Sequence, residues 1–135
     1  MDGMFMQLKV SASALEAQKV RMNVIASNMA NIGSTSTPEG GPYIRKDVTF
    51  QSHMFAEGMV GVDVPKIVED RRPFKKVYDP GHPDADKEGY VSYPNVNIIE
   101  ESVNLMSASR AYEANITLIS SFKEMYNKTL DLAKS

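Results

Sequence analysis

Both ends of this 135-residue chain carry an apolar residue at every seventh position, and the middle does not. Near the N-terminus the repeat falls on Leu8, Leu15, Met22 and Met29. Near the C-terminus it falls on Ile98, Leu105, Tyr112, Ile119, Tyr126 and Ala133. A seven-residue repeat places a narrow apolar stripe along one helix face, and such a stripe is buried most easily against another helix. The repeat therefore predicts a helix at each end and favours a chain built to assemble over one built to catalyse.

The first helix is expected over residues 5–31, where Ala, Leu, Met, Gln and Lys are good helix formers. The companion positions of the repeat, Ser11, Gln18, Ile25 and Ile32, are half polar, so this helix alone is marginally stable. We expect Gly33 to take a positive φ and to end the helix.

The last helix is expected over residues 98–133, with Asn95 or Asn97 as its N-cap. Its large apolar stripe also includes Phe122 and Leu130. A second stripe of small residues runs through Ser107, Ala108, Ala111, Ala114 and Asn115. A helix with a large-residue stripe and a small-residue stripe is typical of one that packs against more than one neighbour.

The middle of the chain combines turn residues with short apolar runs. Residues 34–42 form a loop by composition. Strands are expected at residues 43–45, 48–50, 59–64 and 66–68, with a further candidate at 74–78. Val60, Val62 and Val64 alternate with polar or small residues, which indicates one half-buried face. These runs predict a small, loop-rich β module.

Together the elements predict a mainly α fold with a small β module. We expect an elongated subunit in which the long terminal helices pack as an antiparallel coiled-coil-like pair. The predicted divisions are residues 1–33 for the N-terminal helix, 34–94 for the middle module and 95–135 for the C-terminal helix.

Composition excludes several classes of function. The net charge of −2 gives no general attraction to nucleic acid or to anionic membranes. The absence of cysteine excludes disulfides, thiolate metal sites and cysteine nucleophiles. No apolar signal segment or membrane-spanning run is visible, so the chain either stays in the cytoplasm or leaves by a route that reads no cleavable signal.

The sequence offers little to an enzyme. Its two histidines, His53 and His82, have no accompanying catalytic motif. We expect no catalytic residues, no cofactor and no small-molecule substrate.

An acidic segment resembles the start of a calcium loop. Asp84, Asp86, Glu88 and Gly89 match its first ligand positions, but Asn95 stands where a bidentate glutamate is required. A solvated acidic turn is the favoured interpretation, and no metal site is predicted.

A basic group, Arg71, Arg72, Lys75 and Lys76, has only Phe74 as a flanking aromatic residue. This pattern favours a solvated face or a charged protein contact over a nucleic-acid site.

Several segments resemble a known family. Residues 14–18 and 23–31 resemble the N-terminal signature of flagellar rod and hook proteins. Residues 41–47, 68–70, 73–86, 89–91, 93–97 and 107–115 look like the C-type proximal rod members of that family, so the resemblance covers nearly the whole chain.

The resemblance implies that the terminal helices pack into the inner tube of the rod, around the export channel, while the middle segment forms the outer part. It implies export through the flagellar type III apparatus without signal cleavage, and assembly in the periplasmic space. The implied partners are self-copies, other proximal and distal rod proteins, the rod-base adaptor, the membrane ring protein and the export apparatus.

We therefore predict a structural subunit of the proximal rod, which assembles helically into a drive shaft. The alternative is a cytoplasmic coiled-coil adaptor or scaffold. The predicted assembly interface follows the helix stripes: Leu8, Leu15, Met22, Ile25, Met29, Ile98, Leu105, Tyr112, Ile119, Phe122, Tyr126 and Leu130.

Overall fold

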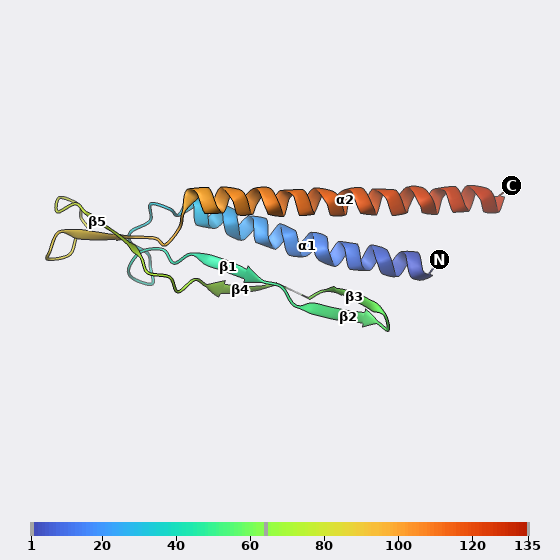
Figure 1. The fold of residues 1–135 in the computed structure, drawn as a ribbon, viewed down its shortest axis with the longest axis horizontal. Helices are drawn as coiled ribbons and strands as arrows, with labels where there is room; N and C mark the ends of the chain where they lie inside the picture. Colours follow the sequence, from blue (N-terminus) through green and yellow to red (C-terminus); the bar gives the residue numbers. More distant parts are fainter. Residues whose placement is uncertain (1, 64, 135) are drawn as a thin grey trace. The chain divides into compact units, whose positions relative to one another are not determined.

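The computed structural model describes residues 2–63 and 65–134 of the chain. A long helix lies at each end of the sequence, α1 (Asp2–Ala30) and α2 (Ile98–Lys134), with short strands between them (Figure 1). The helices contain 29 and 37 residues, about half of the chain. The predicted class, mainly α with a small β module, is therefore confirmed.

Helix α1 starts three residues before the predicted first residue and ends one residue before the predicted last. Asn31 closes its C-terminal end, because both the backbone N–H and the side-chain amide of Asn31 donate to the carbonyl of Ser27, at 3.1 and 2.8 Å. The prediction for Gly33 was wrong: Gly33 is not among the glycines with positive φ. The helix is closed by the hydrogen bonds of Asn31 instead of by a left-handed glycine.

Helix α2 begins at the predicted residue and runs one residue further than expected. Asn97 is its N-cap: the side-chain oxygen accepts hydrogen bonds from the backbone N–H groups of Ile99 and Glu100, at 2.9 and 3.2 Å. Glu100 and Glu101 in the first turn and Lys134 in the last turn suit the helix dipole.

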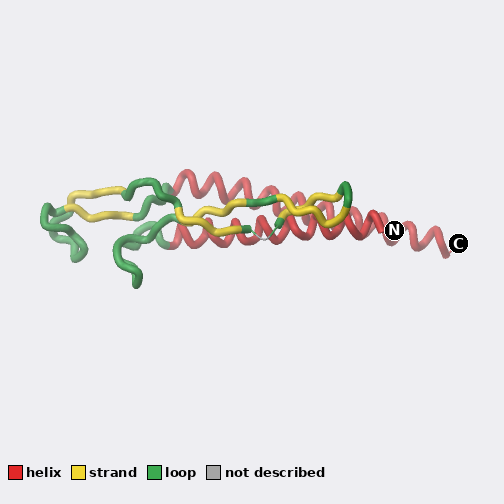
Figure 2. The backbone as a smooth tube through the Cα atoms, turned by 90° about the horizontal axis from the view of Figure 1, so that it is seen from below, coloured by secondary structure: helices red, strands yellow, loops and turns green. Residues whose placement is uncertain are grey.

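The strands of the described residues pair two by two, as the yellow segments of Figure 2 show. They are β1 (Lys46–Thr49), β2 (Ser52–Ala56), β3 (Met59–Val62), β4 (Lys66–Glu69), β5 (Lys75–Tyr78) and β6 (Tyr90–Tyr93). β1 pairs with β4, while β2–β3 and β5–β6 are antiparallel ribbons. The register of the last ribbon places Tyr78 opposite Tyr90, with ring centroids 5.3 Å apart.

The strand predictions were only partly correct. Residues 43–45 precede β1 and are not a strand, and neither β2 nor β6 was expected. The predicted inward face of β3 was also wrong: Val60 is 54% exposed, whereas Gly61 is buried. Val64, which belonged to the same prediction, lies outside the described residues.

Contacts divide the chain into two compact units that cut across its sequence order. Unit 1 comprises Met1–Met22, Thr49–Lys66 and Met106–Ser135, and unit 2 comprises Asn23–Val48 and Ile67–Leu105. Each unit combines parts of both helices with parts of the middle. The functional division into residues 1–33, 34–94 and 95–135 stays a prediction.

In unit 1 the β2–β3 hairpin packs on α1. The Ser13 hydroxyl donates to the carbonyl of Val10 at 2.6 Å and accepts the backbone N–H of Val62 at 3.1 Å. The Lys9 ammonium lies 5.3 Å from the ring centre of Phe55. Among the described residues of this unit, the buried apolar side chains are the small ones of Ala17 and Ala108, which let neighbouring segments approach closely.

In unit 2 the buried apolar residues are Val24, Ile25, Val91 and Val96. They are joined by polar side chains that are equally inaccessible, Asn28, Arg45 and Glu101. The interior of this unit therefore depends on satisfied polar groups as well as on apolar packing.

Candidate functional site

The most constrained part of unit 2 is a cluster of hydrogen-bonded polar side chains, buried at its centre and exposed at its edge. We call it the Arg45 cluster: Asn28, Arg45, Asp70, Arg72, Asn95 and Glu101. Asn28 comes from the last turns of α1 and Glu101 from the first turn of α2. Arg45 directly precedes β1, and Asp70 directly follows β4. The cluster thus joins segments that are far apart in the sequence.

Arg45 and Glu101 form the centre of the cluster. The Nε of Arg45 donates to Oε1 of Glu101, while the side chain of Arg45 is 5% exposed and that of Glu101 is fully buried. An Nη of Arg45 also donates to Asp70 at 3.2 Å. Burial lowers the pKa of Arg45, but the hydrogen bond to Glu101 and its charge outweigh this, and the pKa is raised overall.

Asn28 attaches the end of α1 to the start of β1. Its side-chain oxygen accepts the backbone N–H of Lys46 and the hydroxyl of Tyr43, both at 2.9 Å. Its amide donates to the carbonyl of Lys46 at 2.8 Å and lies 3.5 Å from Glu101. Asn28 thereby satisfies both backbone polar groups of Lys46 without exposing itself to water.

Asp70 and Arg72 form a second ion pair at the edge of the cluster. The guanidinium of Arg72 approaches a carboxylate oxygen of Asp70 to 2.7 Å, and its backbone N–H donates to the other oxygen at 2.9 Å. The hydrogen bond from the Arg72 side chain is the main reason that the pKa of Asp70 falls to about 2. Arg72 also contacts Glu100 of α2 at 3.1 Å.

Asn95 connects the segment that precedes β1 with the segment that follows β4. Its oxygen accepts the backbone N–H of Arg45 at 2.8 Å, and its amide donates to the carbonyls of Asp70 and Arg72, both at 3.0 Å. The side chain predicted as a possible helix cap is therefore used for tertiary bonds instead.

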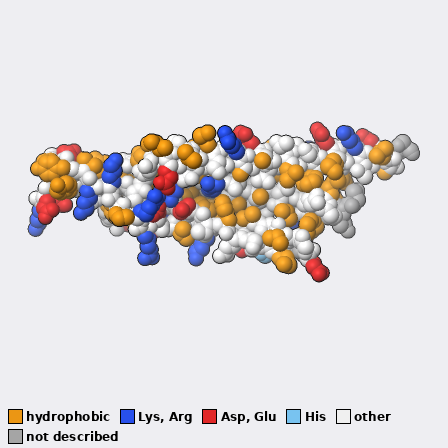
Figure 3. All heavy atoms as spheres, in the orientation of Figure 1, with side chains coloured by type: hydrophobic (Ala, Val, Ile, Leu, Met, Phe, Trp, Pro, Cys, Tyr) orange, Lys and Arg blue, Asp and Glu red, His pale blue; other side chains and the backbone are white. Residues whose placement is uncertain are grey.

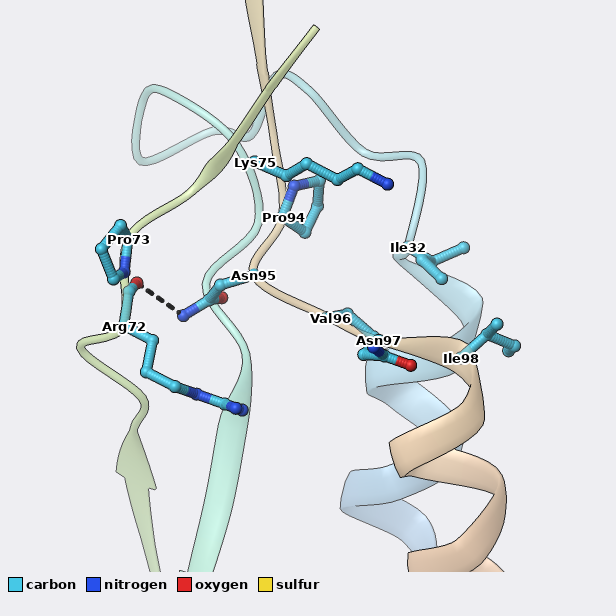
Figure 4. Close-up of a pocket in the computed structure, with 9 residues that line it drawn as sticks. All are labelled: Ile32, Arg72, Pro73, Lys75, Pro94, Asn95, Val96, Asn97 and Ile98. Atoms are coloured by element: carbon cyan, nitrogen blue, oxygen red, sulfur yellow. Dashed lines mark hydrogen bonds between the residues drawn. The ribbon is translucent and has the colours of Figure 1, made fainter.

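An open groove of about 670 Å³ lies beside this cluster in unit 2 (Figure 4). Ile32 and Ile98 stand on one side of it, and Arg72 and Pro73 stand on the other. The amide groups of Asn95 and Asn97 are already bonded to backbone groups, as the dashed line from Asn95 to Arg72 illustrates. The groove has apolar walls and basic side chains, but it brings no nucleophile together with a general base.

The predicted stripe residues are mostly half-buried. Ile25 is buried, Ile98 is 45% exposed, and the other ten are intermediate: Leu8, Leu15, Met22, Met29, Leu105, Tyr112, Ile119, Phe122, Tyr126 and Leu130. One direct contact between the two helices in unit 1 joins the rings of Phe5 and Tyr126, with centroids 5.7 Å apart.

A further set of large apolar side chains on α2 is exposed, and hydrophobic atoms reach the surface over this helix (Figure 3). Ile99 and Val103 belong to unit 2, and Met106, Leu118 and Met125 to unit 1. Their exposed fractions are 74, 59, 57, 44 and 54%, respectively. We call these five residues the outer α2 face.

The remaining sequence candidates have structural roles. His53 stacks edge-on against Phe55, and His82 lies beside Tyr93 and accepts the backbone N–H of Asp84. Arg72 of the basic group is taken up by the ion pairs described above.

The acidic turn uses its carboxylates for local bonds. Asp86 accepts the backbone N–H groups of Glu88 and Tyr90, and Asp84 accepts the hydroxyl of Thr35. Within residues 2–63 and 65–134, three or more acidic or histidine side chains are nowhere grouped to hold a metal ion. None of the helices in these ranges is long and apolar enough to span a membrane.

Sequence reasoning missed Asn28, Arg45 and Glu101. No local pattern marks them, because their partners lie up to 73 residues away. The one available signal was an asparagine among the apolar residues near the end of α1, where it is a weak helix former.

Two family models of flagellar rod proteins match the chain, one towards each end. The family model "Flagella basal body rod protein" matches residues 8–36, and "Flagellar basal body rod FlgEFG protein C-terminal" matches residues 87–132. The chain is 48% identical to the flagellar basal-body rod protein FlgC of Salmonella typhimurium, over 93% of this chain and 94% of that protein. It is 45% identical to FlgC of Bacillus subtilis (96% and 98% covered) and 41% identical to FlgC of Borreliella burgdorferi (95% and 96%).

Proposed function

We propose that the exposed helix faces of this chain are the surfaces on which the rod assembles, because the chain belongs to the FlgC family of flagellar basal-body rod proteins. The chain is a structural subunit of the rod in the flagellar basal body, and its family is not one of enzymes. The alternative prediction, a cytoplasmic coiled-coil adaptor or scaffold, is not supported, since the relatives over nearly the full length are rod proteins.

The outer α2 face carries this proposal. Its side chains are apolar and exposed, whereas Ala108, on another side of the same helix, is fully buried. Exposed apolar residues that recur along one helix mark an interaction surface. In a rod subunit, the surface available to cover them is that of a neighbouring subunit.

We further infer that α1 and α2 pack as an antiparallel coiled-coil-like pair. In unit 1, Phe5 near the start of α1 contacts Tyr126 near the end of α2. In unit 2, Asn28 near the end of α1 approaches Glu101 near the start of α2. Both contacts support opposite helix directions, with the half-buried stripe residues from Leu8 to Leu130 at the interface.

The exposed helix faces and the family together support a proposal for the place of the chain in the rod. We infer a proximal position in which residues 1–33 and 95–135 contribute to an inner tube around the export channel and residues 34–94 to its outer part. Contacts between unlike surfaces of successive subunits generate an open helix, which suits a drive shaft. We infer that the partners are self-copies, other rod proteins, the rod-base adaptor, the ring protein and the export apparatus, with assembly in the periplasm after export without a cleavable signal.

A pair of charge substitutions tests the assembly surfaces. Met125→Asp on the outer α2 face should abolish swimming while the chain is still exported, because it places a carboxylate in a contact that needs apolar burial. Leu105→Asp on the half-buried stripe should have the same effect. Asn127→Asp, at another exposed position on the same helix, is the matched control and should swim normally.

Swimming and the recovery of rods in purified basal bodies are the measurements. Normal swimming of the Met125→Asp strain would contradict the outer α2 face as an assembly surface. Because Met125 is exposed, its substitution tests assembly without removing a buried side chain of the subunit.

A further inference from the structure

We propose that the ion pair between Arg45 and Glu101 is a positioning element, which selects the face of α2 that turns inward in unit 2 and contributes little to net stability. This inference goes beyond the assembly role, because it concerns how the free chain fixes the rotation of one helix. Arg45 and Glu101 are here positioning residues, acting through the orientation of α2.

Apolar burial gives only a weak preference for that face at the start of α2. The first two turns carry two apolar pairs on different sides of the helix: Ile98 and Leu105 on the half-buried stripe, and Ile99 and Val103 on the outer α2 face. Even the stripe side is loosely packed there, since Ile98 is 45% exposed. Ile99 and Val103 are 74 and 59% exposed, although either could have been buried. The side chain that is turned fully inward is instead the carboxylate of Glu101.

Arg45 is also held in place by groups other than Glu101. Its backbone N–H donates to Asn95 at 2.8 Å, its carbonyl accepts the backbone N–H of Asp70 at 2.8 Å, and its guanidinium donates to Asp70 at 3.2 Å. A donor fixed at three points leaves one place for the partner carboxylate. Helix α2 satisfies this donor only when Glu101, and not another residue of the turn, faces it.

A buried ion pair is a poor source of net stability. Removing both charges from water costs about as much as their attraction returns, and apolar replacements of similar size are often at least as stable. Buried polar groups are better attested as devices that fix register. The Arg45–Glu101 pair has the burial of such a device, and Glu101 is the carboxylate partner of Arg45 that lies on α2.

The consequence concerns the outer α2 face. When Glu101 faces inward, Ile99 and Val103 face outward, where the proposed function needs them. That consequence rests on the proposed function, whereas the rotation of α2 is a property of the chain by itself. The following test therefore measures rotation and leaves motility out.

The double variant Arg45→Met/Glu101→Leu removes the pair without leaving a buried charge. Asp70 keeps its contact with Arg72 at 2.7 Å, and Asn28 keeps its bonds to the backbone of Lys46. The single variant Arg45→Met is the contrast, because it leaves Glu101 buried without its cation.

The absence of cysteine allows clean site-specific labelling. Spin labels at Asn23→Cys in α1 and Val103→Cys in α2 report the arrangement of the helices from two exposed positions of unit 2. The distance distribution between the labels is measured on the purified chain by electron paramagnetic resonance, and the thermal midpoint is measured by circular dichroism.

We expect a single narrow distance distribution for the parent chain. The double variant should keep its thermal midpoint within about 5 °C of the parent but give a broadened or multiple distribution. Arg45→Met should unfold at a clearly lower temperature. A positioning role predicts that the double variant changes the distance distribution but not the thermal midpoint. A purely stabilising contact predicts that both quantities change together.

Three results would overturn the inference. One is an unchanged narrow distribution in the double variant. Another is loss of cooperative unfolding in that variant, which would make the pair a stabilising contact. The third is a broad distribution in the parent chain, which would mean that no rotation is fixed.

Discussion

A Cβ atom on Gly61 would overlap the ring of Phe55, standing 2.8 Å from its Cδ2 atom and 2.9 Å from the hydroxyl of Ser13. The β2–β3 hairpin approaches α1 through this glycine, and the neighbouring backbone N–H of Val62 bonds to Ser13. We expect Gly61→Ala to destabilise the chain by about 1–3 kcal/mol, because an added methyl group forces the ring or the hairpin away. Urea unfolding of the purified chain measures the loss.

Gly3→Ala is the matched control for that substitution. Gly3 lies in α1, and a Cβ atom added there would meet no other atom within 4 Å, so alanine should be neutral or slightly stabilising. Faster amide hydrogen exchange at Val62 in Gly61→Ala alone would locate the effect in the hairpin contact. Equal stability of both variants would contradict the close approach.

Asn97→Ala should lower the free energy of unfolding by about 1 kcal/mol. The substitution removes the oxygen that accepts the backbone N–H groups of Ile99 and Glu100 at the start of α2. Asn97→Asp should retain most of the stability, since a carboxylate accepts the same bonds and suits the helix N-terminus. Thermal unfolding followed by circular dichroism distinguishes these outcomes.

Asn127→Ala, at an exposed position within α2, controls for a general change in helix propensity. It should be neutral or stabilising because alanine is the better helix former. A loss of stability at residue 127 that matched the loss at residue 97 would argue against a capping role for Asn97.

The sequence was sufficient for the helices because their signals are local. Apolar residues at seven-residue spacing and an asparagine before an acidic first turn placed α2 to within one residue of its observed end. The family resemblance was also local, in short motifs spread along the chain, and it was confirmed.

The parts that could not be predicted depend on pairs that are distant in sequence. Arg45 and Glu101 are 56 residues apart, and either residue alone reads as a surface charge. The inward face of β3 was misjudged for a similar reason. Alternating valines predict an inward valine face, but the close approach of Phe55 and Ser13 requires the small residue, Gly61, on that side.

The Asp70 carboxyl should make stability depend on pH in the acid range. Its pKa is about 2 in the folded chain against an ordinary value of 3.8. Because the pKa is lower in the folded chain, the ionised Asp70 carboxyl adds to the free energy of unfolding. This contribution is fully present above about pH 4 and is lost as pH falls through about 2. At neutral pH it amounts to about 2 kcal/mol.

Unfolding free energies at several pH values, for the parent and for Asp70→Asn, measure that contribution. The difference between the two should be largest above pH 4 and should vanish towards pH 2, whereas other carboxyl groups affect both chains alike. A difference that did not change with pH would mean that the ion pair with Arg72 is not responsible.

Asn95→Asp should be strongly destabilising although the two side chains have nearly the same size. Asn95 uses its amide to donate to the carbonyls of Asp70 and Arg72, and its oxygen to accept the backbone N–H of Arg45. An ionised aspartate keeps the acceptor but cannot donate, and it places a negative charge against two carbonyl oxygens. We expect a loss of about 2–3 kcal/mol at neutral pH.

Part of this loss should be recovered below pH 4, where a protonated carboxyl can donate to one of the two carbonyls. Urea unfolding at pH 7 and pH 3.5, corrected for the parent at each pH, measures both effects. A stability at pH 7 equal to that of the parent would contradict the role of the Asn95 amide as a donor to the carbonyls of Asp70 and Arg72.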